Sequence, residues 1–298
     1  MNNTSLPVIV VGSANVDFST SVMALPKSGD TVFGTGLART PGGKGLNQAV
    51  ALHRAGAHTK FVFSVGDDSE AAFLREFITQ EGLSSEVLVS RPHPTGRAFI
   101  FVDALGENQI VVLPGANLST DLADVDIDDG EGYLVLQLEI GYDSNLALAK
   151  KARRAGRQVV LTPAPVSELS LELLGFVDIL VLNEAEAMKV SGRKTLSTAS
   201  EKLRELVGTV VITLGARGSA IYAPGYNGEM VPAPEVSALD TTGAGDTFCG
   251  YLVATLAQGA SLRVAAEFAS SAAALAVQRP GAASGVPTFS EVRAQFLS

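Results

Sequence analysis

The sequence predicts an α/β fold, in which a central, mostly parallel β-sheet is flanked by helices and carries a small β-sheet appendage. Short apolar runs rich in β-branched residues recur along the 298 residues, and segments with helical spacing lie between several of them. One region instead shows strand-like runs joined by a glycine-containing turn. Continuous apolar strands that alternate with amphipathic helices are typical of a parallel sheet covered on both faces.

The apolar runs predict strands over residues 8–11, 61–65, 133–138, 159–161, 179–182 and 210–214. Helical spacing predicts one helix over residues 47–55, closed by Gly56, and another over 69–80, followed by Gly82. Glycine after the last helical residue suits the left-handed conformation that ends many helices. An Ala-rich segment, residues 262–277, predicts a further helix near the C-terminus.

Two stretches predict the small appendage. Residues 95–103 and 108–113 are strand-like, and Gly106 lies in the turn between them, so they indicate an antiparallel hairpin. Residues 20–39 lack helical spacing and contain many Gly and Ser residues. We therefore expect a small sheet from about 16–40 and 94–114, within a single domain that spans residues 1–298.

Composition excludes several classes of protein. The chain has 22 basic and 31 acidic residues, a net charge of −9, and no long Lys/Arg run, so we expect no nucleic-acid partner. Apolar residues make up 46%, which argues against a disordered chain. The single cysteine, Cys249, lies on an apolar segment and is expected to be a packed thiol. No signal-peptide pattern or bilayer-length apolar run is evident, so we expect a cytoplasmic protein with no membrane partner.

Polar residues follow several predicted strands at the point where each strand ends. In open α/β sheets, ligands bind just beyond the carboxyl ends of the strands. Each group alone is compatible with a helix cap or a turn, but several at equivalent positions favour one shared cleft. These residues are Asn15 and Asp17, Glu139, and Asn183 and Glu186, and the last strand is followed by the glycine-containing segment of Gly215 and Gly218.

The segment that carries most information is DTTGAGDTF, residues 240–248. Gly243, Ala244 and Gly245 are small enough for a ligand to touch the backbone, and amides at a helix N-terminus favour an anion. Asp246 would repel an anion, unless it acts as a base beside a phosphoryl group. The alternative is an ordinary capping box with an acidic residue in the first turn.

A second glycine-rich segment, PGGKGLNQ, spans residues 41–48. It is not a P-loop, because Lys44 is followed by Gly45 rather than Ser or Thr. Gly43 and Gly45 suit close approach of a polar ligand beside Lys44, and Asn47 adds a directional hydrogen-bonding group. The alternative is a flexible loop before a helix. No dinucleotide fingerprint is present, which disfavours an NAD-dependent oxidoreductase.

The sequence resembles the ribokinase-type carbohydrate kinases, also called the PfkB family. The resemblance rests on residues 12–17, 42–50, 183–186, 240–246 and 277–282, in that order across nearly the whole chain. It implies a ribokinase-like fold with the small sheet as a lid, and ATP-dependent phosphorylation of a primary hydroxyl, first of all D-ribose to ribose 5-phosphate. Fructose, deoxyribose, another pentose or a nucleoside remain alternative substrates. A non-catalytic sugar or nucleotide sensor is disfavoured, because Asp246, Asn183 and Glu186 are all present.

The resemblance also implies roles for single residues. Asp246 would be the catalytic base, and Gly243, Ala244 and Gly245 would form the anion hole for the γ-phosphate. The sugar would be bound by Asn15, Asp17, Gly43, Lys44, Gly45, Asn47, Glu139 and Asp246. The nucleotide would be bordered by Asn183, Glu186, Thr213, Gly215, Gly218, Gly245 and Ser270.

Two cations and a second subunit are implied as well. Glu186 would hold Mg²⁺, mainly through water. A monovalent cation, usually K⁺, would be held by Asp240, Thr242, Ala276, Arg279, Gly281 and Gly285, largely through main-chain oxygens. The lid of this family often pairs two subunits, so the resemblance implies a homodimer.

Overall fold

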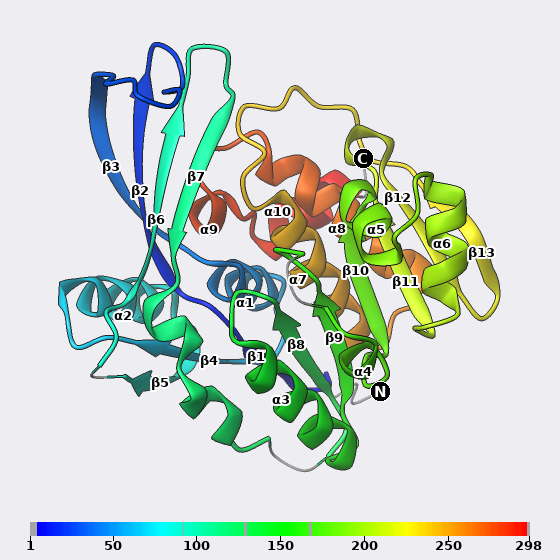
Figure 1. Ribbon diagram of the computed structural model, residues 1–298. Coiled ribbons are helices and arrows are strands. Elements are labelled where there is room, and N and C mark those ends of the chain that lie inside the picture. The colour runs from blue at the N-terminus through cyan, green and yellow to red at the C-terminus, as the bar shows by residue number, and fades with distance from the viewer. Residues whose placement is uncertain (1–4, 91, 128–129, 167–168, 297–298) are drawn as a thin grey trace.

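A computed structural model describes residues 5–90, 92–127, 130–166 and 169–296 (Figure 1). Its larger sheet contains β1 (Val8–Val11), β4 (Thr59–Val65), β5 (Ser84–Val89), β8 (Tyr133–Gln137), β9 (Gln158–Thr162), β10 (Ile179–Asn183), β11 (Thr209–Thr213), β12 (Ser219–Ala223) and β13 (Tyr226–Val231). The smaller sheet contains β2 (Asn15–Val22), β3 (Gly34–Gly42), β6 (Gly96–Val102) and β7 (Asn108–Leu113).

The helices are α1 (Lys44–Arg54), α2 (Ser69–Glu81), α3 (Tyr142–Arg154), α4 (Leu171–Leu174), α5 (Glu184–Ser191), α6 (Leu196–Arg204), α7 (Ala244–Ala257), α8 (Leu262–Ala276), α9 (Ala282–Gly285) and α10 (Phe289–Phe296). Short 3₁₀ turns are η1 (Gly115–Leu118), η2 (Thr120–Asp124) and η3 (Gly215–Arg217).

The larger sheet is parallel over most of its width. Its strand order is β13-β12-β11-β10-β9-β8-β1-β4-β5, and only the pairs β11–β12 and β12–β13 are antiparallel among the described residues. Alternate side chains of each strand point to opposite faces: Val8 and Val10 belong to one apolar core, and Ile9 and Val11 to the other. The sheet is therefore covered on both sides.

Each core is closed by its own set of helices. Helices α1, α2, α7, α8 and α10 contribute to one core, and α3, α4, α5, α6 and η2 to the other. The helix ends follow local chemistry: the Asp68 side chain accepts a hydrogen bond from the Ala71 amide at the start of α2, and Gly82 ends that helix with φ 70°. Cys249 is fully buried on α7, as expected, and burial raises the pKa of its thiol to about 12.

The smaller sheet has the order β3-β2-β6-β7 and projects beyond the body of the molecule (Figure 1). β6 and β7 form the expected antiparallel hairpin, with Gly106 at φ 81° in the turn. The base of the sheet is fixed to α2, because the Asp68 carboxylate accepts hydrogen bonds from both the amide and the hydroxyl of Thr95. β2 begins shortly after β1 ends, and β3 ends just before α1 begins. The base of the smaller sheet is therefore joined through short segments to β1 and α1.

Two sequence-based expectations were incomplete. The first helix begins at Lys44 rather than at residue 47, so Lys44 and Gly45 lie in a helical turn and not in a flexible loop. The antiparallel strands β12 and β13 were missed. β12 (SAIYA) is short and contains three small residues, and β13 (YNGEMV) is a partly exposed edge strand without a continuous apolar run. Among the described residues, no helix is both long and apolar enough to cross a membrane.

Candidate active site

The N-terminus of α7 forms the centre of the site. Gly243 precedes the helix with φ 73°, and no side chain caps the first turn, which begins Ala244, Gly245, Asp246. A Cβ on Gly243 would lie 2.8 Å from the Cβ of Ala282, so the left-handed conformation and the close approach both require glycine. Nothing lies within 4 Å of a Cβ built on Gly245, which leaves the backbone there open to a ligand.

Asp246 is 5% exposed and is held by two neighbouring side chains of α1. Asn47 Nδ2 donates to Oδ2 at 3.0 Å, and Gln48 Nε2 donates to Oδ1 at 2.9 Å. Since both carboxylate oxygens face α1 and α7 has no side-chain cap, the capping-box alternative for Asp246 is wrong. Gln48 was missed by the sequence analysis, although it directly follows Asn47 in the quoted motif.

Lys44 lies among carboxylates. Asp246 does most to raise the pKa of this ammonium above its usual value, burial opposes the increase, and Glu139 and Glu186 add to it. The three acidic groups come from the starts of α7 and α5 and from the turn after β8. Lys44 therefore stays positively charged at the point where these chain segments meet.

Glu139 joins α1 to the loop after β1. Its Oε2 atom accepts hydrogen bonds from the Lys44 amide at 3.0 Å and from the Ser13 hydroxyl, while the Gly45 amide donates to Ser13 Oγ at 3.2 Å. A Cβ on Gly45 would lie 2.6 Å from the backbone of Gly12 and Ser13. Gly45 is thus required for packing of α1 against this loop, not for approach of a ligand as expected, and Ser13 is a site residue that the sequence analysis missed.

Gly43 has a similar explanation. It precedes α1 with φ 94°, and a Cβ there would lie 3.0 Å from backbone atoms of Ser13, Ala14 and Asn15. The space beside Gly43 is therefore filled by the chain itself.

Asn15 and Asp17 lie on β2, at the base of the smaller sheet. Asn15 is 3% exposed, and its Oδ1 accepts a hydrogen bond of 2.7 Å from Nδ2 of Asn117, a residue that was not predicted. Burial, followed by the charge of Glu139, raises the pKa of Asp17 to about 7. The Asp17 carboxylate lies over Gly42, where a Cβ would come within 2.0 Å of Oδ2.

Two cavities meet at the start of α7. The smaller, about 210 Å³, contains Lys44, Asn183, Glu186 and residues 243–246 in its lining. The larger, about 470 Å³, is bordered by Thr213, Gly215, Gly218, Gly245 and Ser270 together with apolar side chains such as Val236, Phe248 and Val277. Both are lined by Thr213, Thr241, Ala244 and Gly245, so the predicted phosphate and nucleotide residues border adjoining spaces.

Three predicted residues of these cavities have distinct local geometry. Asn183 and Glu186 form a reciprocal capping box at the start of α5, with hydrogen bonds of 2.8 Å in each direction. The cap interpretation is therefore right for this pair, and both residues also line the smaller cavity. Ser270 is 3% exposed, and its hydroxyl has no hydrogen-bond partner within the described structure, although it borders the larger cavity.

The residues expected to hold a monovalent cation gather beside the anion-hole turn. Asp240 accepts hydrogen bonds from the Thr242 amide at 2.9 Å and the Gly281 amide at 2.8 Å. Although burial would raise the pKa of Asp240, hydrogen bonds from the Thr242 side chain and from the Gly281 and Thr242 amides lower it below its usual value. The main-chain oxygens of Ala276, Arg279 and Pro280 all lie 3.5–3.6 Å from the position that a Cβ on Gly285 would take.

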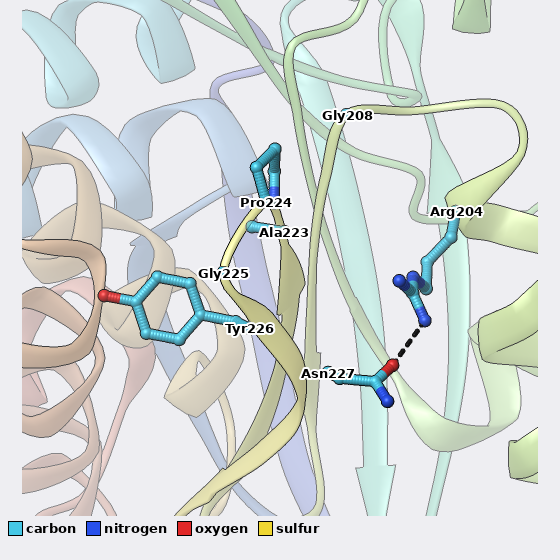
Figure 2. A pocket seen from close by; sticks show the side chains of 7 residues that line it. All are labelled: Arg204, Gly208, Ala223, Pro224, Gly225, Tyr226 and Asn227. Carbon is cyan, nitrogen blue, oxygen red and sulfur yellow. Dashed lines mark hydrogen bonds between the residues drawn. The ribbon is translucent and has the colours of Figure 1, made fainter.

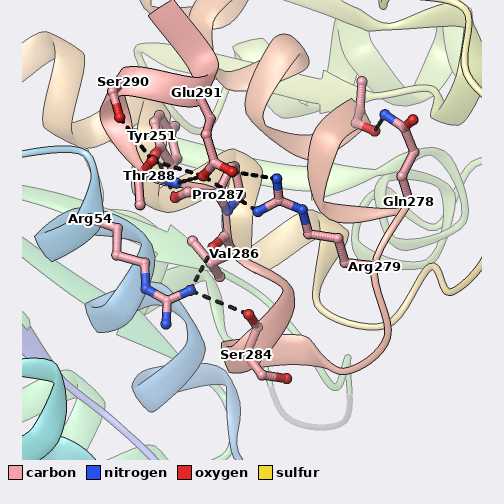
Figure 3. A network of polar contacts seen from close by, with 11 residues as sticks. Arg54, Tyr251, Gln278, Arg279, Ser284, Val286, Pro287, Thr288, Ser290 and Glu291 are labelled. Carbon is pink, nitrogen blue, oxygen red and sulfur yellow. Dashed lines mark hydrogen bonds and ion pairs between the residues drawn. The ribbon is translucent and has the colours of Figure 1, made fainter.

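A polar network fixes the segment that carries these oxygens (Figure 3). The Arg279 guanidinium is paired with Glu291 of α10 at 2.6 Å, so its charge is engaged there, while its main-chain oxygen lies near Gly285. Arg54 of α1 donates to the carbonyl oxygens of Ser284 and Val286 at 3.3 and 2.5 Å. Tyr251 of α7 donates to that of Pro287 at 2.8 Å. No cluster of three or more His, Cys, Asp or Glu side chains suited to a metal ion occurs in the described part of the chain.

Another cavity, of about 600 Å³, contains none of the predicted site residues (Figure 2). It lies at the β12–β13 turn, where Arg204 of α6 donates to Asn227 Oδ1 at 2.6 Å. We do not assign it to the site.

The fold and the site together define a class of protein. A buried carboxylate beside an open helix N-terminus, a lysine among acidic groups and an adjoining, largely apolar cavity are the elements of a small-molecule kinase. The chain belongs to the pfkB family of carbohydrate kinases, which it matches over residues 6–289. The resemblance inferred from the motifs is therefore confirmed, and the protein is an ATP:sugar phosphotransferase with the ribokinase-like fold.

Curated relatives and solved structures agree with this family. The ribokinase of Haemophilus influenzae is 36% identical, over 95% of each chain. The crystal structure of Thermotoga maritima ribokinase is 35% identical, with a TM-score of 0.89 over 98% of this chain and 99% of that chain. The structure of Arabidopsis thaliana ribokinase complexed with ribose and ATP is 31% identical, with a TM-score of 0.87 over 98% and 99%. A bifunctional ribokinase/ribose-5-phosphate isomerase A of Fructilactobacillus sanfranciscensis is 36% identical over 94% of this chain, which spans 54% of that longer protein.

Proposed function

We propose that this chain transfers the γ-phosphoryl group of ATP to the primary hydroxyl of D-ribose, giving ribose 5-phosphate and ADP. The observation that carries this proposal is the position of Asp246, whose carboxylate is fixed at the N-terminus of α7 beside the junction of the two cavities. Relatives of similar length are named ribokinase, and one related structure holds ribose and ATP. The substrate assignment rests on that similarity.

Asp246 takes the proton as the hydroxyl oxygen attacks the γ-phosphorus. The O–H bond breaks, the new O–P bond forms, and the bond between the γ-phosphorus and the β–γ bridging oxygen breaks to release ADP. The backbone of residues 243–245 stabilises the charge on the transferring group. Lys44 contributes a fixed positive charge on the same side.

The sugar is assigned to the space between α1 and the base of the smaller sheet. Asn15, Asp17, Asn47 and Glu139 supply acceptors and donors, which suits a polyol because each hydroxyl both donates and accepts hydrogen bonds. Gly43 and Lys44 border the same region. Gly45 is not assigned to the sugar. Its amide donates to Ser13 Oγ, and its Cα lies against the backbone of Gly12 and Ser13.

The nucleotide is assigned to the adjoining cavities, with adenine and ribose near Thr213, Gly215, Gly218 and Ser270. Mg²⁺ fits beside Glu186, whose half-buried carboxylate lines the smaller cavity. A magnesium ion usually retains several waters, so part of this contact would be through water. The ion would neutralise charge on the phosphates. A monovalent cation fits the oxygens around Asp240 and would place a fixed positive charge beneath the anion-hole turn.

The smaller sheet is proposed as a lid formed by about 16–40 and 94–114, within a single domain of residues 1–298, and as a homodimer interface. The proposed lid exposes large apolar side chains, including Phe33, which is 92% exposed on the segment before β3, and Leu37 of β3, which is 72% exposed. Exposed apolar patches of this kind are typical of interaction surfaces. The cytoplasmic location remains a prediction.

The experiment that tests the substrate is a coupled ADP-release assay with ribose, deoxyribose, fructose, another pentose and nucleosides. We expect the highest kcat/KM for ribose, with ribose 5-phosphate as the product by NMR. A higher kcat/KM for another substrate would overturn the ribose assignment and leave the kinase assignment intact. Absence of ADP release with every substrate would overturn the proposed phosphoryl transfer for this chain.

A further inference from the structure

A chain of buried amide side chains leads from the larger sheet to Asp246. Gln48, fully buried on α1, donates through Nε2 to Asp246 Oδ1 at 2.9 Å and to Thr162 Oγ1 of β9 at 3.3 Å. Its Oε1 accepts a hydrogen bond of 2.7 Å from Nε2 of Gln137 on β8. Because both the donor group and the acceptor of the Gln48 amide are engaged, its orientation is fixed.

The two donors to Asp246 differ in how firmly they are held. The Oδ1 atom of Asn47 is buried without a hydrogen-bond partner within the described structure, so this side chain has an acceptor to offer a sugar hydroxyl. Gln48 is tied back into two strands through Gln137 and Thr162. When a sugar binds, Asn47 can change partners, whereas Gln48 cannot rotate without losing all three of its contacts.

The backbone packs closely around these amide side chains. A Cβ on Gly12 would lie 2.0 Å from Gln137 Oε1, and a Cβ on Gly250 would lie 3.0 Å from the carbonyl oxygen of Gln48. The glycines of the β1 loop and of α7 therefore allow the buried amides to pack closely between sheet and helix.

We infer that Gln48 is a positioning residue for Asp246: it holds Oδ1 in place, so that Oδ2 is presented to the primary hydroxyl as the proton acceptor. This inference rests on the proposed role of Asp246 as the base. A hydrogen bond to an ionised carboxylate also favours its ionised form. The other charged or titratable groups near Asp246 are Lys44 of α1, Glu186 of α5 and Cys249 of α7.

The test compares Gln48→Met, which keeps the side-chain length and removes both the donor and the acceptor, with Gln48→Glu, which adds a second carboxylate. For Gln48→Met we expect kcat to fall by about 10- to 100-fold, while the KM values for ribose and ATP change by less than about threefold. The acidic limb of the kcat–pH profile should move to higher pH by about one unit, and further in Gln48→Glu. Gln80→Met, an exposed change on α2, is the matched control and should keep the wild-type profile.

Fold and nucleotide binding are checked by melting temperature and by calorimetric titration with ADP. If Gln48→Met does not fold, Gln137→Met serves instead: it frees the Gln48 amide to rotate and should give a smaller shift of the same limb. A wild-type kcat and profile in the folded Gln48 variants, or a loss of kcat that is equal at every pH, overturns the inference. Wild-type turnover in Asp246→Asn would instead overturn the proposed base, so the two failures are distinguishable.

Discussion

The Oδ2 atom of Asp240 accepts a hydrogen bond of 2.8 Å from the main-chain amide of Gly281, 41 residues further along the chain. This contact joins the turn before α7 to the loop after α8, and Gly243 packs against Ala282 immediately beside it. The proposed anion hole and the proposed cation-binding loop are therefore parts of one connected structure. A change in either should affect the other.

Replacing Asp240 should weaken the response to potassium. Asp240→Asn removes the negative charge beside the main-chain oxygens of Ala276 and Arg279, so K⁺ should bind less tightly and the concentration for half-maximal activation should rise. The measurement is turnover against KCl concentration at constant ionic strength. If the wild-type protein is as active in Tris buffer without potassium as it is with potassium, the cation site has no role in activity.

Asp246→Asn should reduce kcat by about 10²- to 10⁴-fold, the range for loss of a general base. The amide keeps the size of the side chain but cannot accept the hydroxyl proton. ADP binding should change little, and the melting temperature shows whether the variant remains folded although its new NH2 group replaces one acceptor of Asn47 or Gln48. Asp143→Asn is the matched control, because Asp143 also lies in the first turn of a helix but outside the lining of the site. Unchanged turnover in Asp246→Asn would remove this residue from the role.

Asp17→Asn should stabilise the protein at alkaline pH and impair sugar binding. Burial raises the pKa of Asp17 from 3.8 to about 7, so the folded state loses stability as pH rises from the unfolded value through about 7. Removing the ionisable group should therefore increase the free energy of unfolding at pH 8 by up to about 4 kcal/mol and have little effect near pH 4.

Melting temperature against pH measures the stability part of that prediction. A constant difference between variant and wild type at all pH values would contradict the raised pKa. If ionised Asp17 binds the sugar, the KM for ribose should also rise as the pH of the wild-type assay falls below about 7.

Gly243→Ala should lower both stability and turnover. The residue has φ 73°, and its new Cβ would lie 2.8 Å from that of Ala282, so the variant should lose about 1–2 kcal/mol from the left-handed conformation alone. The turn would shift and move the anion-hole amides. Gly208→Ala, which has open space around its Cβ and no positive φ, is the matched control. Chemical denaturation and kcat measure the two effects, and wild-type values for both would contradict the assignment.

Phe33→Ser should shift the proposed dimer toward monomer. Phe33 is 92% exposed on the segment before β3, and burial in a second copy would be worth about 2 kcal/mol for an aromatic side chain. Sedimentation velocity at several concentrations measures the change. A monomeric wild-type chain at all concentrations would contradict the dimer.

Much of the candidate site was predicted from short motifs. The motifs indicated Lys44 and Asp246 and the glycines beside them, because the role of each of these residues depends on its immediate neighbours in the sequence. Gln48, Ser13 and Asn117 were not recognisable in this way, because each acts through a partner that is distant in the chain, 198 residues away for the Gln48–Asp246 pair. The physical reason offered for Gly45 was also wrong, since a sequence does not show which backbone lies against a glycine.

The sequence by itself determined the alternation of strands and helices, the hairpin around Gly106, and the presence of a carboxylate at the start of an apolar helix. These features depend on periodicity and on local conformational preference, which neighbouring residues control. Only the tertiary structure decided that Asp246 is held by Asn47 and Gln48, that Arg279 turns its side chain toward Glu291, and that Asp17 is buried enough to raise its pKa. Those outcomes depend on packing between segments far apart in the chain, because hydrogen-bond partners and desolvation are set by the neighbours in space.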